Sequence, residues 1–347
     1  MKRATTKRAT AAAAPTARAK KPASASPVVA QLEEIERGKG DGTLELGRGA
    51  TLSVSSLGKV FFPRDKLTKG DVMRFYARVE EAILPVMRDR PLVLKRYPDG
   101  IEGQSFYQQK APDKVPAGVR AETIQNEQGE LQRRLIGGEL ATLLYTVQLG
   151  AVSVDPWHSR VPKLELADFT ILDLDPGAKA PFTRVVEVAK LVHEELTGLG
   201  LTAVAKTSGS SGMHIVIPLR PGVSDETAVL AAQLIATRVA ARAPAIATVE
   251  RTVSARLAGT VYVDYLQNIR AKTVAAAYAV RARPGATVST PLEWNEVDET
   301  LDPRDFTIET VPDRLRERGD IWARVMKKGN SVRALLDTHA RKGKARR

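Results

Sequence analysis

Three aspartates stand in segments that otherwise read as buried β-strands. Asp173 and Asp175 end the run FTILDLDP, one residue apart, and Asp264 ends the run TVYVD. Aspartate is unfavourable in strands and is seldom fully buried, so packing gives no reason for these acids. Because side chains alternate between the two faces of a strand, Asp173 and Asp175 share one face, with Cα atoms about 7 Å apart.

Like-charged carboxylates at this spacing repel each other unless a cation lies between them. Hard oxygen ligands at a strand end suit Mg²⁺ or Mn²⁺. The sequence Asp-Pro-Gly is also ordinary turn chemistry, so Asp173 and Asp175 alone leave open an Asp-capped turn. Three strand carboxylates can hold two cations, an arrangement that activates a 3′-hydroxyl and stabilises a leaving pyrophosphate. With Asp264, the acids predict a phosphoryl-transfer site with two Mn²⁺ or Mg²⁺ ions.

A histidine near a glycine-rich turn supports this interpretation. His214 follows GSSG, and the backbone N–H groups of such a turn can cradle a phosphate. A single histidine of this kind can equally be a satisfied structural residue. The combination of His214 with the three acids is what favours phosphoryl transfer.

Helices and strands in mixed order must position these residues. Residues 182–198 predict an amphipathic helix, LTAVAKTS and MHIVIPL predict two strands joined by GSSG, and residues 225–243 predict an Ala-rich helix. A further helix opens at Thr68 with a capping box to Asp71. Its predicted buried face comprises Val72, Tyr76, Val79, Ile83 and Val86. Strand pairs adjacent in sequence favour an α+β fold with mainly antiparallel sheets flanked by helices.

The composition is that of a soluble globular protein. The 347 residues are 43% hydrophobic and 27% charged, with no cysteine and so no thiolate metal site or disulfide. No apolar run approaches the roughly 18 residues that a membrane span needs, and no secretory signal is evident, so we expect no membrane association. These features fit a reducing cytoplasm.

The positive charge is concentrated at the two ends. Residues 1–26 carry seven Lys and Arg and no acid, and the last seven residues carry five and no acid. The span between them therefore holds only +1 of the net charge of +13. We expect a disordered basic tail at 1–27, one domain of one or two lobes at 28–335, and a basic tail at 336–347. Such tails attract polyanions, nucleic acid above all, or serve solubility and targeting.

The motifs together resemble a known family. Asp173-Leu-Asp175-Pro, KTSGSSGMHIVIPL, VDYLQNIRAKT, AYAVRARPGATVSTPLEW and DPRDFTI are similar to the polymerase domain of bacterial ligase D. That domain belongs to the archaeo-eukaryotic primase superfamily. The similarity continues upstream through LGKVFFPRDKLTKGD, RYPDG, SFYQQKAP and WHSRV and covers roughly residues 50–327. It implies a primase-like catalytic core and a nucleotidyltransferase that extends a 3′-hydroxyl.

The resemblance also implies roles for single residues. The metal ligands and catalytic residues would be Asp173, Asp175 and Asp264. Contacts to the incoming nucleotide would come from Ser208, Ser211, His214, Arg270 and Lys272. The 5′-phosphate and the DNA end would be bound by Lys59, Lys69, Arg96, Phe106 and Tyr107. Without the family, the two lysines read as solvated surface and the two aromatics as core packing.

The chain departs from the family pattern at a few positions. Ser211 stands where a lysine is common, Asp155 replaces a histidine frequent before Pro-Trp, and Ala271 replaces a common glycine. The segment RTVSARLAG is less basic than its counterparts. None of these changes touches the three acids. They bear on nucleotide affinity.

The resemblance predicts a polymerase for DNA repair by non-homologous end joining, adding NTP or dNTP at 5′-phosphorylated breaks or gaps. The sequence has no Lys-x-Asp-Gly, the signature of the adenylated lysine in DNA ligases, which predicts a stand-alone polymerase. It would work at the nucleoid with Ku and a separate ATP-dependent DNA ligase. Two alternatives stay open: a primase that starts chains de novo, and a non-catalytic protein that binds DNA ends or the nucleoid through its tails.

Overall fold

The computed structural model describes residues 26–126, 128–333 and 335–336. The predicted tails lie outside the described residues except at their inner ends. Pro27, expected in the N-terminal tail, is instead the first residue of helix α1 (Pro27–Arg37). Proline is favoured there because the first helical N–H needs no partner within the helix and the proline ring presets φ.

A six-stranded sheet forms the centre of the molecule. In sheet order, its strands are β15 (Ala247–Thr248), β16 (Val261–Asp264), β12 (Phe169–Pro176), β14 (Met213–Pro218), β13 (Val204–Thr207) and β17 (Pro291–Leu292). Neighbouring strands are antiparallel except β15 and β16, which are parallel. The predicted α+β fold with mainly antiparallel sheets is confirmed.

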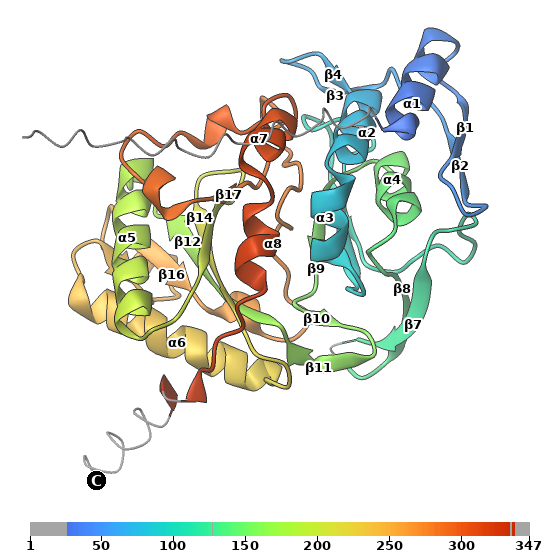
Figure 1. The fold of residues 1–347 in the computed structure, drawn as a ribbon. Coiled ribbons are helices and arrows are strands. Elements are labelled where there is room, and N and C mark those ends of the chain that lie inside the picture. Colours follow the sequence, from blue (N-terminus) through green and yellow to red (C-terminus); the bar gives the residue numbers. More distant parts are fainter. Residues whose placement is uncertain (1–25, 127, 334, 337–347) are drawn as a thin grey trace, which may run out of the picture.

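Two long helices cover one face of this sheet. They are α5 (Phe182–Gly198) and α6 (Asp225–Arg242), on the left and lower side of Figure 1. Leu172 and Leu174 of β12 point into the apolar core beneath these helices. Phe169 and Ile171 point to the opposite face and join a second core. Alternation along β12 thus directs leucines to one core and the Phe169-to-Asp175 row to the other side.

The second core lies under the helices on the right of Figure 1. These helices, α2 (Lys69–Arg78), α3 (Glu80–Met87) and α4 (Leu140–Gln148), accompany a three-stranded sheet of order β6 (Phe106–Gln108), β5 (Leu92–Arg96) and β9 (Ala151–Pro156). The predicted capping box of Thr68 and Asp71 is present. The predicted face is fully buried, but the helix breaks at Val79, where φ is −107° and ψ is 12°.

The remaining elements are short. Four hairpins pair β1 (Gly42–Glu45) with β2 (Thr51–Val54), β3 (Val60–Phe62) with β4 (Leu67–Thr68), β7 (Ala121–Gln125) with β8 (Leu131–Leu135), and β10 (Ser159–Arg160) with β11 (Lys163–Ala167). Single turns of 3-10 helix are η1 (Val253–Ala255), η2 (Leu266–Asn268), η3 (Trp294–Glu296) and η4 (Pro303–Asp305). Two short helices follow near the C-terminal end of the described residues, α7 (Val311–Arg318) and α8 (Ile321–Met326). No helix in the described part of the chain has the length and apolar character to cross a membrane.

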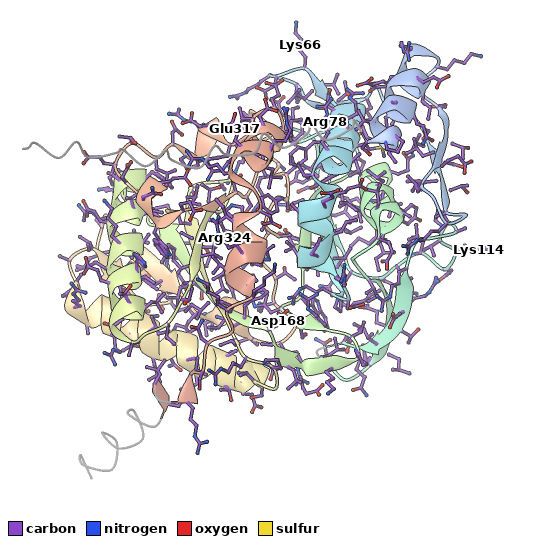
Figure 2. All side chains as sticks on the ribbon, viewed as in Figure 1. Lys66, Arg78, Lys114, Asp168, Glu317 and Arg324 are labelled. Atoms are coloured by element: carbon purple, nitrogen blue, oxygen red, sulfur yellow. The ribbon has the colours of Figure 1, made fainter. Side chains whose placement is uncertain are left out.

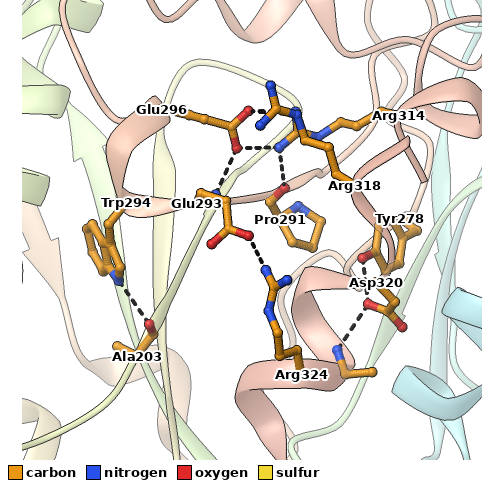
Figure 3. A network of polar contacts seen from close by, with 11 residues as sticks. Ala203, Tyr278, Pro291, Glu293, Trp294, Glu296, Arg314, Arg318, Asp320 and Arg324 are labelled. Carbon is orange, nitrogen blue, oxygen red and sulfur yellow. Dashed lines mark hydrogen bonds and ion pairs between the residues drawn. The ribbon is translucent and has the colours of Figure 1, made fainter. Parts of the chain in front are cut away.

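A polar network closes the β17 edge of the central sheet (Figure 3). Arg314 of α7 donates two hydrogen bonds to the carboxylate of Glu296 and a third to the backbone oxygen of Pro291 in β17. Arg324 of α8 forms an ion pair with Glu293 just beyond that strand. A two-residue edge strand covered by arginine side chains offers little backbone to another chain.

A buried arginine joins the end of α3 to the start of β12. Arg90 follows α3, has a side chain that is 1% exposed, and donates to both oxygens of Asp168, just before β12. Arg160 donates to the same carboxylate. Asp168 lies in the middle of the molecule, below α8 in the view of Figure 2. Burial acts to raise the pKa of Asp168, but the two arginines outweigh it and the pKa is lowered.

We predict that Asp168→Ala destabilises the protein by about 3–5 kcal/mol, because it leaves the buried charge of Arg90 without a partner. Denaturant unfolding at neutral pH measures this loss. The control is Glu194→Ala, which breaks the exposed ion pair with Arg242 and should cost at most about 1 kcal/mol. Since the pKa of Asp168 is lowered by folding, its contribution is lost as pH falls through the folded pKa. Equal losses in both variants at neutral pH would contradict the prediction.

Candidate active site

A row of polar side chains crosses the central sheet. Asp173 of β12 lies opposite Asp264 of β16 on one side and opposite His214 of β14 on the other. His214 in turn lies opposite Lys206 of β13. Residues directly opposite each other in antiparallel strands project to the same face. The register therefore brings two acids, a histidine and a lysine from four strands into one line.

Asp175 extends the acidic end of this row. It lies two residues after Asp173, on the same face, opposite Tyr262 of β16. Burial raises the pKa of Asp175, and the charges of Asp173 and Asp264 raise it further. Burial also raises the pKa of Asp173, while Lys206 and Arg281 oppose that rise. The three carboxylates lie on one face and repel one another. Bound cations would balance their negative charge.

The acid cluster fits divalent cations in its donor atoms. All three side chains offer hard oxygens, which Mg²⁺ and Mn²⁺ prefer. Asp264 is turned toward local donors, the backbone N–H of Leu266 and the Nε2 of Gln267. Within the described residues, no three His, Cys, Asp or Glu side chains form a ready metal cage. The strands bring the acids together, and binding of ions would require side-chain rotation.

The predicted histidine connects the acids to a buried lysine. His214 is 3% exposed, and its Nε2 lies 3.2 Å from Oδ1 of Asp173. Its Nδ1 lies 2.6 Å from Nζ of Lys206. Burial, and then the charge of Arg281, lower the pKa of Lys206 to about 7. Burial likewise holds the pKa of His214 well below its ordinary value.

The glycine-rich turn between β13 and β14 lies against β12. The Oγ of Ser208 accepts hydrogen bonds from the backbone N–H groups of Ser210 and Gly212. A Cβ at Gly212 would stand 2.3 Å from the backbone oxygen of Leu174, the residue between the two acids. Ser211 is exposed at the tip of the turn. Ser208 therefore shapes the turn, and only glycine lets it approach the acids.

Two basic residues in this region were missed by the sequence analysis. Lys206 and Arg281 lie in the motifs KTSG and AVRARPG, which had served only to indicate the family resemblance. Arg281 donates to the backbone oxygen of Ser208, and its charge lowers the pKa of both Lys206 and His214. The sequence did contain a signal for Lys206, because it is a charged residue in an otherwise apolar strand. Packing gives no reason for a charge there, as for the three acids.

Arg270 and Lys272 do not join the row. Arg270 forms an ion pair with Asp225 at the start of α6, at 2.7 Å. The neighbouring Asn268 side chain bonds to the backbone of Ile171, which places this segment beside the half of β12 farther from Asp175. Lys272 is exposed. Arg270 is thus engaged with Asp225 rather than with the polar row.

Two departures from the family pattern have clear surroundings. Asp155 of β9 accepts a hydrogen bond from Ser153, and its charge raises the pKa of Lys206 and His214. It therefore faces the basic end of the polar row. Ala271 has φ of 64°, a left-handed conformation that glycine adopts without strain. The glycine common in the family at this position matches that requirement.

Lys59 and Lys69 form a second basic site, near the end of α4. Lys69 is 5% exposed, and its Nζ donates to Oε1 of Gln148, the last residue of α4. The backbone N–H of Lys69 donates to the backbone oxygen of Lys59 at 2.8 Å, so the two residues are neighbours; burial lowers the pKa of Lys69, and the charge of Lys59 lowers it further. Lys59 forms an exposed ion pair with Asp99. The structure brings this predicted pair together.

Arg96 meets the same helix end. Its Nε donates to the backbone oxygen of Leu149, just after α4, where the helix dipole favours cations. Arg96 also lies 5.0 Å from the ring centroid of Phe106, and Lys95 lies 5.5 Å from that of Tyr107. The rings are 46% and 64% exposed, so neither is core. As successive residues of β6, they project to opposite faces and cannot form one continuous stacking surface.

Comparison with known proteins gives consistent results. A family model described as the LigD primase-polymerase domain matches residues 68–322. The "Bifunctional non-homologous end joining protein LigD" of Bacillus subtilis is 31% identical over 269 residues, and the "Multifunctional non-homologous end joining protein LigD" of Pseudomonas aeruginosa is 32% identical over 292. These alignments cover 77% and 83% of this chain but only 43% and 34% of the relatives.

A solved structure is also similar. It is described as the polymerase domain from Mycobacterium tuberculosis ligase D in complex with DNA, and it is 30% identical to this chain. The two structures superpose with a TM-score of 0.74, covering 80% of this chain and 99% of the other. The described core therefore corresponds to nearly the whole of that polymerase domain.

We predict that Gly212→Ala destabilises the protein by about 1–3 kcal/mol, because the added methyl group meets backbone at Leu174 and the strand must shift. Chemical denaturation measures the change. The control is Gly198→Ala at the end of α5, where a Cβ would meet nothing within 4 Å and stability should stay equal or rise. An unchanged midpoint for Gly212→Ala would show that the turn is free to move away from the acids.

Proposed function

The chain belongs to the LigD primase-polymerase family, and on that premise we propose that it adds nucleotides to the 3′-hydroxyl of DNA at 5′-phosphorylated breaks or gaps. The observation that carries this proposal is the register of β12 and β16, which sets Asp173 opposite Asp264 with Asp175 on the same face. The reaction is transfer of a nucleotidyl group from NTP or dNTP, with release of pyrophosphate.

Asp173, Asp175 and Asp264 would hold two Mn²⁺ or Mg²⁺ ions. When bound, the ions would activate the 3′-hydroxyl and neutralise charge on the leaving pyrophosphate. The role of the three carboxylates is to fix the positions of those charges. Burial raises the pKa of Asp175, and the charges of Asp173 and Asp264 raise it further; cation binding would relieve that repulsion, which supports this role.

The basic end of the polar row would receive the triphosphate. His214 offers its Nε2 on the same face as the acids, and Arg281 lies beside the turn that carries Ser208. Ser211 is exposed at the tip of that turn and would contact phosphate through its hydroxyl and backbone. Together these groups would orient the nucleotide and balance its charge. Arg270 and Lys272 would act outside this pocket, on DNA.

The lysine pair would recognise the DNA end. Lys59 and Lys69 are neighbours through their backbones, and a pair of adjacent lysines suits a terminal phosphate without reading sequence. Phe106 and Tyr107 are exposed and backed by cations, so each can stack on a base from its own side of the strand. Arg96 would hold β6 in place and contribute charge.

The cellular setting is part of the proposal. The relatives named for non-homologous end joining are two to three times longer than the matched region, so the activity and partners of the whole relatives enter here only as proposals. We propose that the chain acts at the nucleoid with Ku and a separate ATP-dependent DNA ligase. De novo priming remains the second candidate, favoured only by the superfamily.

The central experiment measures incorporation of labelled NTP and dNTP on a gapped duplex with a 5′-phosphate, with Mn²⁺ and with Mg²⁺. Extension with either metal supports a polymerase, and the ratio between NTP and dNTP gives the sugar preference. Synthesis on an unprimed template would instead favour the primase. Binding of DNA without any incorporation would leave only a non-catalytic end binder.

We predict that Asp173→Asn, Asp175→Asn and Asp264→Asn each reduce nucleotide addition by on the order of 10²–10³-fold or more, because each removes a charge that holds a cation. Mn²⁺ binding, measured by titration calorimetry, should weaken in parallel. The control is Asp298→Asn, an acid whose side chain only caps a local turn. Full activity in any of the three variants would remove that residue from the metal site.

We predict that Lys59→Gln with Lys69→Gln abolishes discrimination between gaps with and without a 5′-phosphate. The wild-type chain should bind the phosphorylated gap more tightly, because each charge-assisted contact to phosphate contributes about 1.5–3 kcal/mol. Lys190→Gln, an exposed lysine of α5, is the matched control. Indifference of the wild-type chain to the phosphate would count against the repair assignment and for the primase.

A further inference from the structure

Lys206 is a cation enclosed by acceptors. Its side chain is fully packed in the sheet, with an exposed fraction of 1%. Its Nζ lies 3.0 Å from the backbone oxygen of Ala275, 2.6 Å from the Oγ of Ser289 and 2.6 Å from Nδ1 of His214. Lysine is almost never fully buried unless it is paired, so this position requires an explanation.

The hydrogen count fixes the direction of two of these bonds. The carbonyl oxygen of Ala275 can only accept. The hydroxyl hydrogen of Ser289 is donated to the backbone oxygen of Thr207, so its Oγ must accept from Lys206. Below its pKa of about 7, Lys206 is an ammonium group with a third hydrogen for the remaining neighbour, Nδ1 of His214; the neutral amine, with two hydrogens, would instead accept from Nδ1–H. All three hydrogens then have an acceptor, as a buried ammonium requires.

The other nitrogen of His214 is determined in consequence. If Nδ1 accepts, the neutral ring carries its hydrogen on Nε2, which lies 3.2 Å from Oδ1 of Asp173. The reverse arrangement would put a hydrogen on Nδ1 and a bare Nε2 lone pair against a carboxylate. A doubly protonated ring is disfavoured because it would set an Nδ1–H against the hydrogens of the Lys206 ammonium group, 2.6 Å away.

We propose that Lys206 is a positioning residue that fixes His214 with its Nε2–H toward the reaction face. Asp173 alone could hold this tautomer while its carboxylate is free. Once that carboxylate binds a cation, its charge is no longer available to Nε2–H, and Lys206 becomes the group that keeps the hydrogen pointing outward. A nucleotide phosphate, which only accepts hydrogen bonds, would then meet a donor. This last step rests on the proposed polymerase function.

The tautomer can be tested without any catalysis. The chain has four histidines, so ¹⁵N-histidine labelling with long-range ¹H–¹⁵N correlation resolves His214, assigned by its loss in His214→Ala. Asp173→Ala removes the other anchor, and in that background we expect His214 to keep a single form protonated at Nε2. Adding Lys206→Met should give a mixture of the two tautomers. A single Nε2–H form in the double variant would overturn the proposal, as would loss of that form in Asp173→Ala alone.

A control variant tests whether a disturbance of the fold alone could change the His214 resonances. Thr170→Val removes a buried hydroxyl of β12 that bonds to α6 on the other face of the sheet, and it should leave the His214 resonances in place. If Lys206→Met does not fold, Lys206→Gln replaces it, since its side chain is one atom shorter and falls short of Nδ1. The expectation for His214 is the same.

Kinetics separate a positioning role from general support. Lys206→Met should raise KM for the nucleotide by on the order of tenfold, the loss expected for one buried hydrogen bond. Because Lys206 acts through His214, the variant Lys206→Met with His214→Ala should be no worse than His214→Ala alone. Multiplicative losses would show an independent structural role and contradict the proposal. If the wild-type chain adds no nucleotide at all, the proposed function fails, whereas the resonance measurement still decides the role of Lys206.

Discussion

The register of β12 between β14 and β16 is the constraint on which the site depends. Side chains on a strand alternate with a period of two, so a slip of one residue would bury Asp173 and Asp175 under α5 and α6 and turn Leu172 and Leu174 outward. The two apolar cores make that slip unfavourable, because the side chains on each face of β12 pack into a different core. The apolar side chains of β12 therefore fix the positions of Asp173 and Asp175, although they take no part in the reaction.

Charge along the polar row changes sign across the sheet. Asp264, Asp173 and Asp175 make one end negative, and Lys206 with Arg281 makes the other positive, with the neutral ring of His214 between them. This change of charge along the row suits a nucleotide substrate. Its reacting phosphate would lie near cations held by the carboxylates, and its other phosphates would lie near the basic groups. The same feature explains why Arg281 and Lys206 partly offset the raised pKa of Asp173. The row is thus electrostatically coupled throughout.

Much of this arrangement could be predicted from the sequence, for reasons that differ between elements. Alternation placed Asp173 and Asp175 on one face, and the helix at residues 182–198 was predicted with its observed bounds because its periodicity is strong. The break at Val79 was missed because the apolar pattern continues through it, so periodicity carries no sign of the change in backbone angles. The ion pair of Arg270 with Asp225 could not be predicted, because the two residues are distant in sequence. Lys206 was overlooked because its acceptors, Ala275 and Ser289, are brought to it only by tertiary folding.

The strand β6 carries two exposed aromatic rings at the open edge of the three-stranded sheet. An uncovered edge with apolar side chains invites pairing with another copy and, in time, fibrous aggregation. Here the strand is only three residues long, and a positive charge from Lys95 or Arg96 lies against each ring. Two copies brought edge to edge would set these cations against each other, whereas a polyanion would be drawn in. Colloidal stability and choice of ligand thus come from the same few side chains.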